Sequence, residues 1–197
     1  MRRLLLCTLL IVAGCLGPRA DLSTFYVITA NATTSANSEP LAVTLGVGPL
    51  ALPGYLDRSE LVTRLNENQV ALSEMERWAE PLLDNVARAV TANLVRVLQP
   101  DGHVAYPWYE SAGVDYGVAV RFTRFEADST GSVALDASWR ITSGDAQETL
   151  YRGNSLIQED ATAVAAEQRV AALSRALAQL SDEIAAAVRR VHAGARF

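Results

Sequence analysis

The sulfur of a cysteine can be modified covalently, and this chain has two cysteines, Cys7 and Cys15. Cys15 ends the run Val12-Ala13-Gly14-Cys15, which follows Arg2, Arg3 and an apolar stretch. This run resembles a bacterial lipobox, in which the cysteine sulfur receives a diacylglyceryl group before the chain is cleaved. The uncharged segment is shorter than the roughly 20 residues of a membrane-spanning helix. We therefore expect a lipoprotein signal peptide over residues 1–14 and a covalent lipid on Cys15.

A lipidated cysteine would begin the mature chain and leave it without a free thiol, because Cys7 is discarded with the signal peptide. Disulfides, cysteine-ligated zinc and a cysteine nucleophile are thereby excluded from the folded part. Two or three acyl chains would anchor the protein permanently. Residues 15–23 would form a short tether that reaches roughly 26 Å beyond the cysteine. Leu16, rather than an aspartate, follows the cysteine, which favours the outer membrane over the inner one.

The remaining side chains favour no catalytic or metal site. All 17 basic residues are arginine, which excludes a Schiff-base or P-loop lysine, and genomic base composition explains this usage best. His103 and His192 have no partner at ligand spacing, and Ser111 and Ser155 lack a nucleophile elbow. The mature chain has 15 arginines and 22 acidic residues, and this net charge of −7 disfavours nucleic acid. We expect no enzyme activity, no metal, and no cofactor besides the lipid on Cys15.

Hydrophobic periodicity predicts the elements of a single domain, residues 24–197. Strands are expected where β-branched and aromatic residues gather or where apolar residues alternate. The last three segments are separated by turn residues and predict an antiparallel meander. Pro49 must lie at an edge or a bulge of its strand, because it has no N–H to donate. The predicted strands are Thr24–Ala30, Leu41–Leu52, Gln69–Ser73, Val114–Phe122, Val133–Ile141 and Thr149–Ile157.

Two helices are predicted before the meander. Asp57-Arg58-Ser59-Glu60 resembles a capping box and would start a short helix. Pro81 suits the first position of a longer helix that runs to Leu98, with an apolar stripe at spacings of three and four. The apolar face of the short helix would consist of Leu61, Val62 and Leu65, and the stripe of the longer one of Leu83, Val86, Val90, Leu94 and Val97.

A third helix is predicted over Ala161–Val191, and it carries a heptad seam. The seam would pack on the sheet, or part of it would meet another subunit. Together these elements predict an α+β fold, in which an antiparallel sheet packs against helices and the chain ends in a long helix. The seam residues are Ala166, Val170, Leu173, Leu177, Leu180, Ile184, Ala187 and Val191.

Two motifs lie between the second predicted strand and the longer helix. The first is Leu52-Pro53-Gly54-Tyr55-Leu56-Asp57-Arg58 with Leu61-Val62-Thr63-Arg64, and the second is Arg77-Trp78-Ala79-Glu80-Pro81-Leu82. With the lipobox and the long C-terminal helix, they resemble the PqiC family of ABC-type transport auxiliary lipoproteins over about residues 24–191. The resemblance implies an α/β fold, a non-enzymatic role, ring-like homo-oligomers, and work with MCE-type periplasmic lipid transporters.

The motif residues have two interpretations. In the first, Tyr55 and Trp78 anchor helix starts in the core, and Arg77 pairs with Glu74 or Glu80. In the second, the group contacts a partner or another subunit, because aromatic residues and arginine are enriched at interface centres. The candidate contacts are Tyr55, Leu56, Asp57, Arg58, Arg64, Arg77 and Trp78.

We therefore expect an outer-membrane-anchored periplasmic accessory lipoprotein that docks or stabilises the conduit of an MCE lipid-transport system and supports membrane integrity. Its partners would be the MCE-domain protein with its transporter complex, the membrane, and further copies of the chain, but not nucleic acid. The alternative is a periplasmic carrier that holds an acyl chain between sheet and helices, and a periplasmic hydrolase ranks last.

Overall fold

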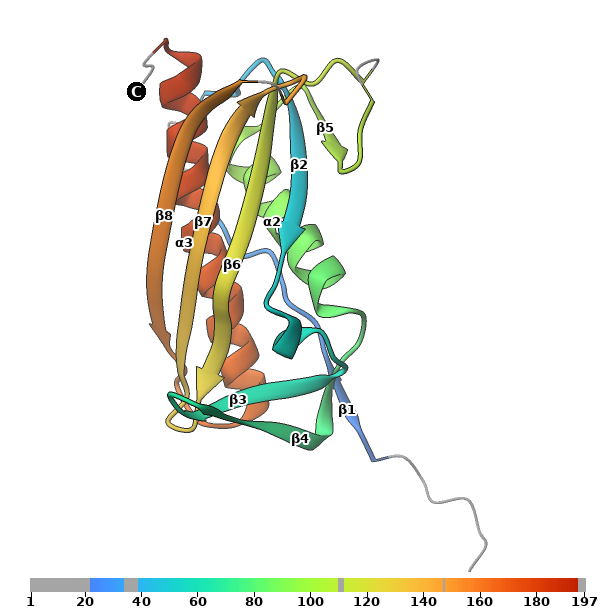
Figure 1. Cartoon of the computed structure of the whole chain (residues 1–197), viewed down its shortest axis with the longest axis vertical. Coiled ribbons are helices and arrows are strands. Elements are labelled where there is room, and N and C mark those ends of the chain that lie inside the picture. The colour runs from blue at the N-terminus through green and yellow to red at the C-terminus, as the bar shows by residue number, and fades with distance from the viewer. Residues whose placement is uncertain (1–21, 34–38, 110–111, 147, 195–197) are drawn as a thin grey trace, which may run out of the picture.

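Eight strands form one mixed sheet, and two long helices cover one of its faces in the described part of the chain (Figure 1). This computed structural model describes residues 22–33, 39–109, 112–146 and 148–194. The predicted signal peptide, Cys15 and most of the tether lie outside the described residues. The elements are β1 (Thr24–Tyr26), β2 (Thr44–Ala51), the 3-10 turn η2 (Gly54–Leu56), β3 (Glu60–Asn66), β4 (Gln69–Trp78), α2 (Leu82–Leu98), β5 (Gly102–Ala105), β6 (Tyr116–Asp128), β7 (Ser132–Ser143), β8 (Thr149–Asp160) and α3 (Ala166–His192).

The predicted α+β class is confirmed, but the sheet is antiparallel only in part. Strands β6, β7 and β8 form the predicted antiparallel meander, and β3 and β4 form an antiparallel hairpin. On its other edge, β6 pairs in parallel with β2 near its start and with β3 at its end. Strands β5 and β1 add in parallel to β2 and β4. Alternation along a strand indicates which face is buried, but it does not specify which distant strand lies alongside.

The long helix α3 covers the meander and buries the whole predicted seam. It contacts β6, β7 and β8 as well as α2. The sheet and α2 therefore cover the seam within one chain, and a contact between α3 and another subunit would have to use other residues of the helix. The helix begins at Ala166 rather than at Ala161, and the residues before it form bends.

After β1 the chain continues as an extended strap along the helices. The strand predicted over Thr24–Ala30 therefore ends early, at Tyr26. Ile28 is fully buried, and its N–H donates to Asn85 Oδ1 at 3.0 Å. The N–H of Ala32 donates to Asn93 Oδ1 at 2.9 Å. Buried asparagines of α2 thus satisfy the backbone of the strap, so that it needs no neighbouring strand.

The short helix predicted after Asp57 is wrong, because these residues form strand β3. Asp57 ends the turn η2 instead of starting a helix, and its N–H donates to the Gly54 carbonyl at 3.2 Å. Leu61 and Val62 are buried as expected, but pairing with β4 and β6 stabilises the extended conformation. Strand β4 is also longer than predicted.

Helix α2 and the bulge in β2 agree with the predictions made from the sequence. The helix runs to Leu98 as predicted, with Pro81 as its N-terminal cap. Pro49 lies at a bulge, where the register against β6 shifts between Val47 and Leu50. His103, expected in a turn, lies in strand β5. No helix among the described residues has the length and apolarity needed to span a membrane.

Candidate functional site

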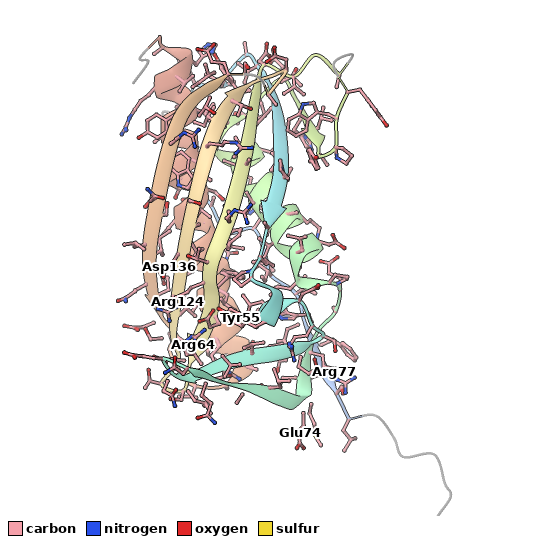
Figure 2. The ribbon with its side chains drawn as sticks, viewed as in Figure 1. Tyr55, Arg64, Glu74, Arg77, Arg124 and Asp136 are labelled. Atoms are coloured by element: carbon pink, nitrogen blue, oxygen red, sulfur yellow. The ribbon has the colours of Figure 1, made fainter. Side chains whose placement is uncertain are left out.

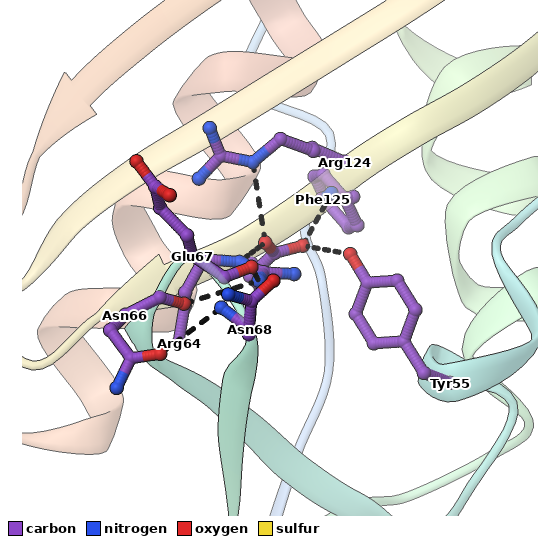
Figure 3. A network of polar contacts seen from close by, with 8 residues as sticks. Tyr55, Arg64, Asn66, Glu67, Asn68, Arg124 and Phe125 are labelled. Atoms are coloured by element: carbon purple, nitrogen blue, oxygen red, sulfur yellow. Dashed lines mark hydrogen bonds and ion pairs between the residues drawn. The ribbon is translucent and has the colours of Figure 1, made fainter.

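The buried carboxylate of Glu126 accepts hydrogen bonds from two residues of the first motif, Tyr55 and Arg64, which Figure 3 labels. The Tyr55 hydroxyl donates to Glu126 Oε2 at 2.7 Å, and Arg64 Nε donates to Oε1 at 2.5 Å. The N–H of Phe125 donates to Oε2 at 3.0 Å, and Arg124 Nε lies 3.4 Å from Oε1. Glu126 is 2% exposed, so these charge-assisted hydrogen bonds form largely out of water and are strong.

Three elements meet at this carboxylate. Tyr55 comes from η2, Arg64 from β3 and Glu126 from β6. The guanidinium of Arg64 lies 5.5 Å from the centre of the Tyr55 ring, at the distance of a cation–π contact. Its Nη1 also donates to the carbonyls of Asn66 and Glu67, at 3.4 and 3.2 Å. The cluster therefore fixes both the turn and the hairpin to the long strands.

Each group of the cluster has a defined protonation state. Burial favours a higher pKa for the Glu126 carboxyl, but the hydrogen bonds from Arg64, Tyr55 and the Phe125 N–H outweigh it and lower the pKa. Burial, and then the hydrogen bond to Glu126, raises the pKa of Tyr55 to about 12. The hydrogen bond to Glu126 also raises the pKa of Arg64. None of these groups titrates near neutral pH, which suits a structural cluster better than acid–base catalysis.

The other motif residues separate into buried and exposed ones. Trp78 is 6% exposed and lies in the core just before α2, which agrees with the anchoring interpretation for this residue, and the candidate contact Leu56 is also buried, at 1% exposed. Asp57 and Arg58 have exposed side chains, and Arg58 Nε donates to the Tyr55 carbonyl at 2.9 Å. These two are the predicted contacts that remain most accessible to a partner.

Arg77 does not make either of the predicted ion pairs. Glu80 pairs with Arg88 at 2.6 Å, and among the described residues no ion pair joins Arg77 to Glu74. Arg77 is half-buried in β4, and its Nε is buried without a hydrogen-bond partner. Figure 2 shows Arg77 and Glu74 well apart from Tyr55 and Arg64, so Arg77 is not part of the Glu126 cluster, although the apolar residues Leu56 and Trp78 of the two motifs line one small hollow in the core.

Glu126 is the residue that the sequence interpretation missed. The predicted strand ended at Phe122, where the register between β6 and β7 shifts. Beyond this bulge the phase of the strand changes, so that Phe125 and Ala127 are buried in the core and Glu126 lies between them on the other face. A change of apolar phase, from positions 118, 120 and 122 to 125 and 127, is the signal that could have indicated it.

An open groove of about 1000 Å³ lies between α2 and the neighbouring strands β2 and β5. Leu83, predicted to be buried in the helix stripe, is 39% exposed along it, and Tyr106 is 56% exposed. The layer between sheet and helices is closely packed beneath η2 and β3. There, a hollow among Leu56, Trp78 and Leu173 measures about 10 Å³. The groove, unlike this hollow, has the volume that an acyl chain requires.

The side chains considered for catalysis are dispersed. His103 lines the groove, whereas His192 Nδ1 lies 3.4 Å from the Tyr116 hydroxyl. The Ser155 hydroxyl accepts from Trp139 Nε1 at 2.9 Å and donates to Glu183. Ser111 lies outside the described residues. No group of three or more potential metal ligands occurs among the residues that the structure describes.

Comparisons with known proteins agree with this architecture. A crystal structure of a Xanthomonas campestris protein is 17% identical, has a TM-score of 0.70, and is matched over 93% of its length and 83% of this chain. A second solved structure, of an uncharacterised protein, is 25% identical with a TM-score of 0.65, over 99% of its length and 79% of this chain. No curated protein matches the chain.

The chain folds into an α+β domain in which Tyr55 and Arg64 of the first motif hold η2 and β3 against Glu126 of β6. The model of one family, described as the ABC-type transport auxiliary lipoprotein component, matches residues 26–185. The chain belongs to this family, as the two motifs and the lipobox predicted.

Proposed function

We propose that this protein is an outer-membrane-anchored accessory lipoprotein of an MCE-type lipid-transport system, in which it docks or stabilises the periplasmic conduit. The observation that carries the proposal is the match of the family of transport auxiliary lipoproteins to residues 26–185. The lipobox at Cys15 and the residue after it, Leu16, support the outer membrane as the site of anchoring. Homo-oligomers follow only from the family resemblance, since the seam of α3 is buried within one chain.

In-cell crosslinking of the full chain, tagged at its C-terminus, tests this proposal. The MCE-domain protein encoded beside it should be recovered in excess over a control in which an unrelated outer-membrane lipoprotein carries the same tag. Recovery of the lipoprotein without any MCE-domain protein would contradict the proposal. Asp57→Arg, on the exposed part of the first motif, should reduce recovery if this surface contacts the partner, and Asp101→Arg, in the exposed connection after α2, is the matched control.

The groove beside α2 supports a second candidate, a carrier that holds an acyl chain. Its volume of about 1000 Å³ exceeds that of one lipid tail, and its walls include exposed apolar side chains. Native mass spectrometry of the full chain should then show about one phospholipid per subunit. Ala92→Trp would fill the groove and remove the bound lipid, whereas Ala171→Trp, at an exposed position of α3, would not. An empty wild-type protein would exclude the carrier.

A further inference from the structure

Three arginines lie together on the face of the meander that the helices leave open. Arg140 of β7 is directly opposite Arg152 of β8. Arg121 of β6 is opposite Ser138, which precedes Arg140 by one full period of the same strand. All three arginines are exposed, whereas Trp139, the strand neighbour of Arg140, is buried on the helix side. The register therefore places three guanidinium groups side by side on one surface.

In the part of the chain that the structure describes, no ion pair joins an acidic side chain to this cluster. The five ion pairs of the described structure involve other arginines, and within the described residues no hydrogen bond involves Arg121, Arg140 or Arg152. The carboxylate nearest in the register is that of Asp136, one period from Ser138, and it forms none of the five ion pairs. Like charges directly opposite each other destabilise a sheet. A bound anion would remove this repulsion in a chain that is acidic overall.

The surface at the cluster is also hollowed. A hollow of about 310 Å³ is lined by all three arginines together with Ser138 and Asn154, which add a hydroxyl and an amide donor. Its other walls include small side chains such as Ala51, opposite Arg121 on β2, which leave the centre open. The site thus presents planar guanidinium forks and neutral donors around a space large enough for a phosphate group.

We propose that this hollow binds a phosphate group, and that a phospholipid headgroup supplies it. Two neighbouring guanidiniums can hold phosphate oxygens in bidentate fashion, while Ser138 and Asn154 donate to the remaining oxygens and to the glycerol hydroxyls. The overall arginine usage reflects base composition, but the register of β6, β7 and β8 determines this local arrangement. The inference rests on the proposed function only in taking a lipid as the source of the phosphate.

Calorimetric titration of the detergent-purified full chain with two soluble probes tests the site. Glycerophosphoglycerol, the deacylated headgroup of phosphatidylglycerol, should bind saturably and more tightly than inorganic phosphate. Arg140→Gln or Arg152→Gln should weaken binding roughly ten-fold or more, and added NaCl should weaken it further. Arg58→Gln removes one exposed charge from the connection between η2 and β3, outside the hollow, and should leave the affinity within about two-fold of wild type.

The outcomes separate the sources of the phosphate from failure of the site. Equal or tighter binding of inorganic phosphate would support a phosphate site but overturn the headgroup assignment. Absence of saturable binding, or the same affinity in Arg140→Gln, would overturn the site, as would dissociation of an oligomer in Arg140→Gln, because the arginines would then contact a second copy. Circular dichroism checks that the variants fold. Failure of the MCE-domain protein to crosslink would contradict the proposed function without affecting these titrations.

Discussion

Arg64 Nε lies 2.5 Å from Glu126 Oε1 and connects strand β3 to strand β6, although the two residues are 62 positions apart. The carboxylate side chain is 1% exposed and the guanidinium side chain 19% exposed. A buried ion pair of this kind is destabilising when either partner is removed, because the remaining charge stays out of water. The conspicuous arginine and tyrosine of the first motif therefore hold the hairpin and its preceding turn in place.

Removal of the Tyr55 hydroxyl should destabilise the protein without changing its shape. Tyr55→Phe deletes the 2.7 Å hydrogen bond to Glu126 Oε2 and leaves one carboxylate oxygen with fewer donors. We expect the free energy of unfolding to fall by about 1.5–3 kcal/mol, measured by urea denaturation. Tyr109→Phe is the matched control, because Tyr109 is 80% exposed. Equal stabilities of the two variants would show that the Tyr55 bond contributes nothing.

Neutralisation of Glu126 should change how stability depends on pH. The folded protein lowers the pKa of this carboxyl below its ordinary value of 4.5, so its charge stabilises the fold above that pH. This stabilisation is lost as the pH falls through the folded pKa. Glu126→Gln should cost about 3 kcal/mol at pH 7, and its stability should approach that of wild type below pH 4.5. Denaturation curves between pH 7 and 3 measure the difference, and a constant gap would refute the assignment.

The meander should not tolerate a side chain at Gly153. A Cβ there would lie 2.2 Å from Cζ2 of Trp139, which is 7% exposed and stacked on Tyr151. Gly153→Ala must displace the indole, and we expect a loss of about 1–3 kcal/mol or more, with an altered near-UV spectrum. Gly54→Ala is the control, since nothing lies within 4 Å of a Cβ at that position. A wild-type spectrum for Gly153→Ala would contradict the packing described here.

Lipidation should depend on one of the two cysteines. Cys15→Ser removes the sulfur that would carry the lipid, so the N-terminal peptide should lose the mass of the lipid and keep the uncleaved residues 1–14. Cys7→Ser changes a residue of the predicted signal peptide and should leave the N-terminal peptide of the mature chain unchanged. Mass spectrometry of the N-terminal peptide measures both effects. An N-terminal peptide of the wild-type chain that carries no lipid on Cys15 would contradict the assignment.

The sequence alone determined the features that depend on local patterns. Period-two alternation predicted the meander, and the spacing of Leu173, Leu177 and Leu180 predicted a long helix with a buried stripe. The helix predicted from Asp57 to Leu65 was wrong because the apolar spacing of this segment suits a helix or a strand equally. Only pairing with β4 and β6 distinguishes the two.

Only the tertiary structure decided which distant residues act together. Glu126 meets Tyr55 and Arg64 because a bulge in β6 turns its side chain toward η2, and no local pattern encodes that encounter. Arg121, Arg140 and Arg152 likewise converge through the register of three strands. Local propensity acts over a few residues, whereas strand register and the burial of charge are set by contacts between segments that are far apart in the chain.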